Sequence, residues 1–247
     1  MNEQDAINAY MERRGMREFR LTTALIDMDG TLYDSMGNHA DAWYRLISGI
    51  GIECTRDEFF LYEGRTGAST INLLFNRAYG HDATPEQAKE LYRKKTVYFS
   101  DMPPVYPMPG AKEMVDTLLS HSITTVLVTG SGQNTLLNRL DTDYPGAFPS
   151  ERRITSRDVT RGKPDPEPFL KAMTIVNALP EGCIAIDNAP LGIQSGAASG
   201  AFTIGVTTGP IPHEELHKAG ADIIYPSMAE LARSLPELIS LILQTEK

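Results

Sequence analysis

Asp27-Met28-Asp29-Gly30-Thr31-Leu32 follows the apolar run Ala24-Leu25-Ile26, and this stretch anchors the interpretation of the whole chain. Ionised carboxylates are seldom buried unless they are paired or hold a metal, so two of them at the end of a buried strand indicate chemistry. The pattern favours Asp27 as a nucleophile and metal ligand, with Asp29 as a proton donor and acceptor. The structural alternative is a turn in which Asp29-Gly30 only ends the strand, but such a turn does not require Asp27.

Short β-branched runs recur along the chain and alternate with helical patterns. Strands are expected at residues 22–28, 124–129, 153–156, 183–187, 202–206 and 222–225, and helices at 111–120, 167–177 and 191–199. This alternation predicts an α/β fold with a Rossmann-like parallel sheet and helices on both faces. The carboxyl ends of parallel strands meet at one edge, so functional side chains are expected there.

The segment from residue 36 to 104 interrupts the alternation. It contains only helical patterns, at residues 38–50, 69–79 and 85–99, and leads into a proline-rich stretch at 102–110 that cannot be helix interior. We therefore expect residues 36–104 to form an inserted α-helical cap on a core made of residues 21–35 and 105–247. Residues 1–20 are an expected extension, whose short helix stops at Gly15 and serves packing or a partner rather than catalysis.

The composition limits the class of protein. The chain has 247 residues, 41% of them hydrophobic, and a formal charge of −9. This balance argues against a nucleic-acid partner, which needs clustered cations, but permits a small phosphorylated ligand. There is no signal-like or membrane-spanning stretch, and Cys54 and Cys183 are far apart. Cys183 is expected to be a buried thiol rather than half of a disulfide, and the cytoplasm is the expected location.

Three further stretches place polar side chains after predicted strands. The turn Thr129-Gly130-Ser131 offers a hydroxyl and free N–H groups to a phosphoryl oxygen, although turns of this type are often only structural. Lys163 precedes a proline and can neutralise a nucleophile and a phosphate together, or it is a solvated loop residue. Asp187 and Asp27 would present hard oxygen ligands to Mg²⁺, whereas the alternative for Asp187-Asn188 is a helix N-cap.

The order DxDGT, Thr, Lys-Pro and Asp-Asn-x-Pro-x-Gly resembles the haloacid dehalogenase superfamily, in particular its phosphoryl-transferring members with a helical cap. The resemblance extends from about residue 21 to the C-terminus. It implies that Asp27 takes the phosphoryl group as an aspartyl-phosphate, and that Asp29 protonates the leaving oxygen and later activates the incoming one. Dehalogenases and phosphonate-cleaving members lack this second acid, so Asp29 indicates phosphate esters.

The resemblance also implies the remaining site residues. Thr129 and Lys163 would hold the phosphoryl group. Mg²⁺ would lie between Asp27, the backbone carbonyl of Asp29 and Asp187, with Asn188 as a further candidate ligand where relatives usually have a second acid. Contacts with the substrate are expected from Gly30, Thr31, His39, Arg65, Gly130 and Ser131.

Within the superfamily the chain is most similar to β-phosphoglucomutase-like proteins, which carry a His at the position of His39; a plain surface or core histidine is the alternative there. The chain departs from the mutase pattern at three positions, because Glu63 and Gly132 replace lysines and Gly67 replaces an arginine. Glu63 should repel a second phosphate, although Arg65 could compensate.

Three functions follow from these observations. The main prediction is Mg²⁺-dependent hydrolysis of a small sugar-phosphate-type monoester. The first alternative is a β-phosphoglucomutase that interconverts β-glucose 1-phosphate and glucose 6-phosphate. The second is a non-catalytic binding protein on a phosphatase scaffold, suggested by Asn188 and the N-terminal helix. The oligomeric state does not follow from the sequence.

Overall fold

Six parallel strands form one sheet in the order β3-β2-β1-β4-β5-β6 in the computed structural model, which describes residues 2–132 and 134–245. Their bounds are β1 Thr23–Ile26, β2 Thr124–Val128, β3 Arg153–Ile154, β4 Cys183–Asp187, β5 Phe202–Val206 and β6 Ile223–Tyr225. The register aligns Ile26 with Leu127 on one side and with Ile186 on the other. Strands β1, β2 and β4 therefore end at nearly the same level, and the predicted α/β fold is confirmed.

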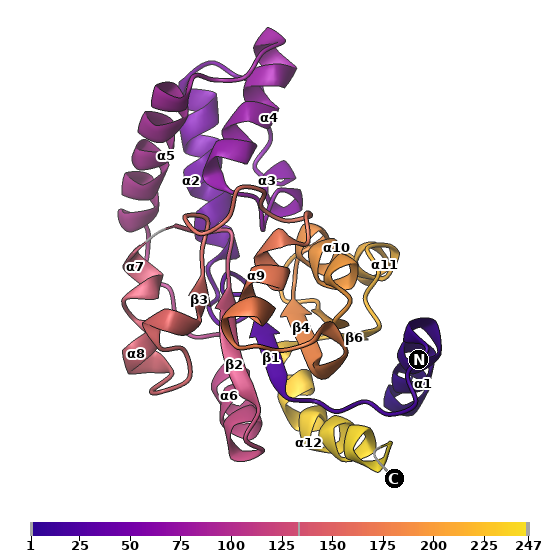
Figure 1. Cartoon of the computed structure of the whole chain (residues 1–247). Coiled ribbons are helices and arrows are strands. Elements are labelled where there is room, and N and C mark those ends of the chain that lie inside the picture. The colour runs from indigo at the N-terminus through magenta and orange to yellow at the C-terminus, as the bar shows by residue number, and fades with distance from the viewer. Residues whose placement is uncertain (1, 133, 246–247) are drawn as a thin grey trace.

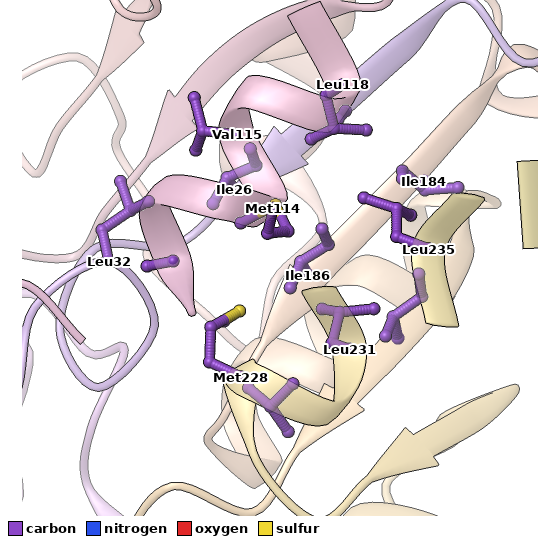
Figure 2. Close-up of a cluster of buried hydrophobic side chains, with 14 of the residues drawn as sticks. Ile26, Leu32, Met114, Val115, Leu118, Ile184, Ile186, Met228, Leu231 and Leu235 are labelled. Carbon is purple, nitrogen blue, oxygen red and sulfur yellow. The ribbon is translucent and has the colours of Figure 1, made fainter. Parts of the chain in front are cut away.

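Helices cover both faces of the sheet. On one face α6 (Ala111–Ser120) packs against α12 (Met228–Gln244). Figure 2 shows side chains of both helices meeting Ile26, Ile184 and Ile186. On the other face Leu25, Ala185 and their neighbours pack against α9 (Glu167–Ile175), and α10 (Pro190–Ser199) lies over β4 and β5. Alternate residues of each strand thus enter opposite halves of the core.

The N-terminal helix α1 (Glu3–Arg14) belongs to this core. Its buried residues include Ile7 and Tyr10, and the Tyr10 ring centroid lies 5.3 Å from those of Phe19 and Phe202. The Tyr10 hydroxyl donates a hydrogen bond to the carbonyl of Gly200 at 2.9 Å. The helix ends at Gly15, as predicted, where φ is +64°. Packing, rather than a partner-facing role, accounts for the buried face of this helix.

Between β1 and α6 the chain forms four helices and none of the strands of the sheet. These are α2 (Met36–Gly49), α3 (Glu58–Leu61), α4 (Gly67–Tyr79) and α5 (Pro85–Ser100), which we call the helical insert. Figure 1 shows them beyond the carboxyl ends of the strands. They share an apolar cluster that includes Trp43, Phe59 and Leu74. This cluster also includes Ile193 and Leu216 of the core, so apolar packing joins the insert to the core.

The two connections to the insert run side by side. Tyr33 and Pro107 form an antiparallel bridge. The Asp34 N–H donates to the carbonyl of Tyr106 at 3.0 Å, and the Met108 N–H donates to that of Leu32 at 2.9 Å. As predicted, the proline-rich stretch is not helical. Its paired arrangement with the chain after β1 was not foreseen.

Several elements are shorter than predicted. Strand β1 stops at Ile26 rather than residue 28, because the Met28 carbonyl accepts hydrogen bonds from the N–H groups of Leu32 and Tyr33 and the chain turns. Strand β3 contains only two residues instead of four. Helix α9 ends at Ile175 rather than residue 177, where Asn177 has a positive φ of 55°.

Some elements were missed altogether. Helix α12 contains Pro236, whose presence argues against a helix interior, but this residue is exposed while Leu231, Leu235 and Leu238 are buried. The short helices α7 (Asn134–Leu137), α8 (Leu140–Asp143) and α11 (His213–Lys218) and the 3₁₀ turns at Ser150–Arg152 and Pro180–Gly182 are too brief for a periodic signal. Among the described helices, none combines the length and apolar character that crossing a membrane requires.

Candidate active site

The ends of β1, β2 and β4 meet around the ammonium of Lys163. Its Nζ donates to Asp27 Oδ1 at 2.6 Å, to Asp187 Oδ2 at 2.7 Å and to the carbonyl of Val128 at 3.0 Å. Lys163 is 2% exposed, and both carboxylates are also buried. A solvated loop lysine is thereby excluded, and the three donor bonds use the full hydrogen-bonding capacity of the ammonium.

Burial and neighbouring charges shift the pKa values of Asp27 and Lys163. Burial raises the pKa of Asp27 to about 8; the Lys163 ammonium opposes this shift, whereas the carboxylates of Asp187 and Asp29 add to it. Burial disfavours the charged form of Lys163, but Asp187 and Asp27 outweigh it and raise its pKa. Lys163 therefore remains charged, in a site where negative charge exceeds what one ammonium can neutralise.

Asp29 is held by a chain of buried side chains from the insert. Its Oδ1 accepts hydrogen bonds from Ser35 Oγ at 2.7 Å and His39 Nε2 at 2.9 Å, while Lys95 Nζ lies 2.5 Å from His39 Nδ1. A lysine ammonium can only donate, so His39 Nδ1 must accept and the imidazole proton must lie on Nε2. Burial and the Lys95 charge lower the pKa of His39, which keeps this ring neutral.

The same hydrogen-bonded side chains also lower the pKa of Asp29. Burial would raise the pKa of this carboxyl, but the interaction with His39 and the Ser35 hydroxyl together lower it. The alternative of a plain core or surface histidine at position 39 does not describe these contacts. Lys95 was missed by the sequence reasoning, although a lysine on the face of α5 that also carries Ala88 and Phe99 is an unusual signal.

The turn after β2 approaches the insert closely. The Ser131 N–H donates to Thr129 Oγ1 at 3.0 Å, and Thr129 and Ser131 are both buried. A Cβ on Gly130 would lie 2.4 Å from the carbonyl oxygen of Gly64, so only glycine permits this contact between core and insert. The turn thus presents backbone groups to the space between them.

Gly30 and Thr31 form the floor beside Asp29. Gly30 has a φ of +82°, and a Cβ there would lie 2.1 Å from Asn188 Nδ2. Thr31 is fully buried, and its hydroxyl has no hydrogen-bond partner among the described residues. Asn188 therefore packs directly on the Asp29-Gly30 loop.

The oxygen-bearing side chains of Asp27, Asp187 and Asn188 line one cavity but differ in their hydrogen bonds. Both carboxylate oxygens of Asp187 are engaged, because Oδ2 accepts from Lys163 and Oδ1 accepts from the Ala189 N–H at 3.0 Å. By contrast, Oδ1 and Nδ2 of Asn188 are buried without a hydrogen-bond partner in the described parts of the chain. In those parts, no group of three or more His, Cys, Asp or Glu residues is arranged to hold a metal. A cation here would need amide or backbone carbonyl oxygens beside Asp27.

A cavity lies between the strand ends and the insert. From the insert it is lined by Trp43, Tyr62, Glu63, Gly64, Arg65, Gly67, Thr70, Tyr92 and Lys95, in addition to His39. Burial and the charge of Asp29 raise the pKa of Glu63 to about 8, with Lys95 opposing the shift. Arg65 directs Nη1 to Ser69 Oγ at 3.1 Å, and its Nε is buried without a partner among the described residues. The cavity thus has acids on both sides.

A family model for the haloacid dehalogenase-like hydrolases matches residues 21–200. The chain therefore belongs to this family of enzymes, as the order of its motifs predicted.

Among curated proteins, the chain is 29% identical to the validoxylamine A 7′-phosphate phosphatase of Streptomyces hygroscopicus subsp. limoneus, over 84% of this chain and 94% of that protein. It is 25% identical to the β-phosphoglucomutase of Bacillus subtilis, over 87% and 93% of the two chains. A solved structure from Bacteroides vulgatus, provisionally assigned as a β-phosphoglucomutase, is 42% identical with a TM-score of 0.93, over 97% of this chain and 98% of that one. These relatives include both a phosphatase and a phosphoglucomutase.

Proposed function

We propose that this protein is a Mg²⁺-dependent phosphatase that hydrolyses a small sugar-phosphate-type monoester through an aspartyl-phosphate on Asp27, with residues 36–104 acting as a cap. The observation that carries this proposal is the separation of two buried acids into different environments. Asp27 is paired with the Lys163 ammonium, whereas Asp29 is bonded to the neutral His39 and to Ser35. Such a division suits a nucleophile beside an acid–base group.

The two acids act in sequence. In the first step a carboxylate oxygen of Asp27 attacks phosphorus, and the alkoxide that leaves takes a proton from Asp29. In the second step ionised Asp29 accepts a proton from the water that attacks the aspartyl-phosphate. The lowered pKa of Asp29 favours this second role, whereas the negative charge of a phosphate monoester bound beside it favours the protonated form that the first step requires.

Lys163 and the turn after β2 hold the phosphoryl group. The ammonium is fixed by its three acceptors and lies against Asp27 before any substrate binds, so it needs little rearrangement during the reaction. Thr129 and the Gly130 N–H would contact phosphoryl oxygens, and the Ser131 N–H holds the Thr129 hydroxyl in place.

The assignment of the Mg²⁺ ligands follows from the different hydrogen bonding of Asp187 and Asn188. We assign Asp27, the backbone carbonyl of Asp29 and Asn188 Oδ1 as the protein ligands of Mg²⁺, and Asp187 as the residue that positions Lys163 and the start of α10. When bound, Mg²⁺ would supply positive charge to the phosphoryl oxygens. This assignment revises the expectation that Asp187 itself is a direct ligand.

Hydrolysis is favoured over the mutase reaction by the charges of the insert. A mutase must bind a second phosphate, yet Glu63 lines the cavity, and the insert's two cations there, Arg65 and Lys95, are bonded to Ser69 and His39. The phosphatase names among the relatives, which also include hexitol phosphatase A of Escherichia coli at 26% identity, support the same choice. The mutase remains the second candidate because of the likeness to the Bacteroides vulgatus structure.

The deciding experiment supplies β-glucose 1-phosphate with a trace of glucose 1,6-bisphosphate and Mg²⁺, alongside a panel of sugar and polyol monophosphates. Release of inorganic phosphate from members of the panel supports the hydrolase. Formation of glucose 6-phosphate without free phosphate overturns it in favour of the mutase. A protein that acts on no ester, and whose properties are unchanged by Asp27→Asn, would be a binding protein on this scaffold.

A further inference from the structure

Residues around α8 hold both connections between the core and the insert. Arg139 Nη1 donates to the carbonyl of Val105, in the returning connection, at 2.5 Å, and its Nη2 pairs with Asp143 Oδ2 at 2.8 Å. The same Asp143 oxygen accepts a hydrogen bond from the hydroxyl of Tyr33, in the outgoing connection, at 3.0 Å. The guanidinium also lies over the Tyr33 ring, with its carbon 5.3 Å from the ring centroid. One ion pair therefore reaches both connections.

A buried tyrosine adds a further contact to the outgoing connection. The Tyr144 hydroxyl donates to the carbonyl of Leu32, and the Tyr144 ring meets that of Tyr33 edge-on, with the centroids 5.8 Å apart. Burial raises the pKa of both phenols, so both hydroxyls stay protonated and act as donors. We call Arg139, Asp143 and Tyr144 the clamp.

The clamp is itself fixed to the core. Leu140, which begins α8, is fully buried in the core cluster of the sheet. Arg153, at the start of β3, donates from Nη1 to the carbonyl of Leu137 at 3.2 Å and from Nη2 to Asp141 Oδ1 at 2.5 Å. These contacts tie the clamp to a strand of the sheet rather than to the insert.

The clamp acts on the part of the chain that carries Asp29. The carbonyl of Tyr33 accepts a hydrogen bond from the Gly30 N–H at 2.8 Å, and Asp29 and Tyr33 form a parallel bridge. The two side chains that bond to the Asp29 carboxyl lie further along, because Ser35 directly precedes α2 and His39 is part of it. Asp29 thus has one support from the core and one from the insert.

The size of the cavity indicates that the insert must move. The space that the cavity offers to the centre of a water-sized sphere is about 30 Å³, enough for about two water molecules. A sugar phosphate is far larger, so it enters only when the insert moves away from the strand ends. Ser35 and His39 would then shift relative to Asp29, whereas the clamped connections stay bonded to the core. During this movement the support of Asp29 from the core is the one that persists.

We propose that Arg139 is a positioning residue of this site: through the clamp it keeps the loop that carries Asp29 in place on the core while the insert turns. Asp29 must lie at the leaving oxygen when phosphoryl transfer begins, and a misplacement of about 1 Å can lower the rate about 100-fold. Binding of a phosphate group depends instead on Lys163 and the turn after β2. The proposal rests on the proposed function, because it explains how the acid–base group of that reaction is held.

The first test measures amide hydrogen exchange by mass spectrometry, which needs no turnover. Arg139→Met leaves the Val105 carbonyl without its donor and Asp143 without its cation. Residues 28–35 should then exchange about tenfold faster, whereas residues 183–187 of β4 should exchange as in the wild type. Unchanged exchange at residues 28–35 overturns the proposal. An equal acceleration at residues 183–187 also overturns it, because that result would indicate a general loss of stability.

Two further variants complete this test. Arg233→Met removes an exposed ion pair of α12 and should change the exchange of neither segment. Tyr33→Phe removes only the hydroxyl that bonds to Asp143, so it should accelerate exchange at residues 28–35 about two- to fivefold. If Arg139→Met does not fold, wild-type exchange of this segment in Tyr33→Phe overturns the proposal. Equal acceleration of this segment in Arg233→Met and Arg139→Met contradicts it as well.

The second test measures binding. Trp43 is the single tryptophan of the chain and lines the cavity, so its fluorescence reports occupancy. With Mg²⁺ present, the wild type and Arg139→Met are titrated with inorganic phosphate and with orthovanadate, which mimics the five-coordinate phosphorus of the transfer. The variant should bind orthovanadate about tenfold more weakly but phosphate within about twofold of the wild type. Kd values that change by the same factor, or not at all, overturn the positioning role.

The two tests separate this proposal from the proposed function. A wild-type protein that binds orthovanadate no more tightly than phosphate, and that releases no phosphate from any ester, contradicts the proposed function. The exchange of residues 28–35 in Arg139→Met still decides whether the clamp holds the loop of Asp29. Conversely, an active phosphatase whose Arg139→Met variant exchanges like the wild type overturns the clamp alone.

Discussion

The core edge and the helical insert contribute to this site in opposite ways. At the core edge, Asp27, Thr129 and Asp187 follow or end adjacent strands, and the register of the sheet places them together. In the insert, His39 comes from α2, Tyr92 and Lys95 come from α5, and Glu63 comes from the loop after α3. The reacting groups are therefore fixed by sheet geometry, whereas the groups that surround the leaving alcohol depend on how helices pack. Chemistry and selection are encoded in different regions.

Several specific polar and backbone contacts join the two regions at the site. Lys95 and His39 connect α5 and α2 to Asp29, Tyr92 connects α5 to Gly132, and the loop at Gly64 touches Gly130. Each contact reaches a group in or beside the reactive centre. Closure of the insert should consequently affect turnover as well as binding.

The largest effect should come from the core edge. Asp27→Asn removes the proposed nucleophile, and phosphate release should fall by at least about 10⁵-fold. The matched control is Asp34→Asn, which changes an exposed acid on the same connection and should leave turnover near the wild-type value. Substantial turnover in folded Asp27→Asn would contradict the assignment of Asp27 as the nucleophile.

A smaller but clear effect should come from the insert. Lys95→Met leaves His39 Nδ1 buried without its donor, a loss of about 1–3 kcal/mol, so kcat/KM should fall roughly 5- to 150-fold. Lys94→Met, at the adjacent exposed position, is the control. Equal kinetics for the two variants would show that the Lys95–His39–Asp29 chain does not contribute to catalysis.

The cation assignment can be sharpened by adding a charge. Asn188→Asp should increase the affinity for Mg²⁺ about tenfold, or 1.4 kcal/mol, because a carboxylate replaces a neutral amide oxygen. Isothermal titration calorimetry with MgCl₂ measures this without substrate, and Asn8→Asp on α1 serves as the control. An unchanged affinity would remove Asn188 from the ligand set.

The smallest effect concerns stability and pH. The pKa of Glu63 is raised from 4.5 to about 8, so between these values the folded protein holds a proton that the unfolded chain releases. The contribution of Glu63 to the free energy of unfolding therefore falls as pH rises through this window.

Glu63→Gln removes this dependence. Its Tm should exceed that of the wild type by about 2–4 °C at pH 8, and the difference should shrink toward pH 5. Thermal unfolding at both pH values, with the exposed Glu53→Gln as control, measures it. A Tm difference that does not change with pH would show that the pKa of Glu63 is not raised in the folded protein.

The sequence predicted the sheet and the core-edge residues well, for a physical reason. A buried parallel strand leaves a continuous apolar run, and the polar residue after it must lie at the carboxyl edge. The cap residues lacked such a signal, since Tyr92 and Lys95 look like ordinary positions of a charged helix until α4 and the turn after β2 pack against them. Asp187 was predicted to be a metal ligand, and its contacts with Lys163 and the Ala189 N–H, on which the revised proposal rests, could not be read from the sequence.

The bridge between Tyr33 and Pro107 has a consequence for how such proteins diversify. The chain leaves the core and returns to it through two segments that lie side by side and are joined by backbone hydrogen bonds. The insert is therefore attached to the core at two neighbouring points. The Tyr33 hydroxyl, bonded to Asp143 at 3.0 Å, anchors the first of these segments to α8 independently of the insert. A foreign helical segment with matching ends could be spliced between the same two points, which makes residues 36–104 an exchangeable cassette for recombination or engineering.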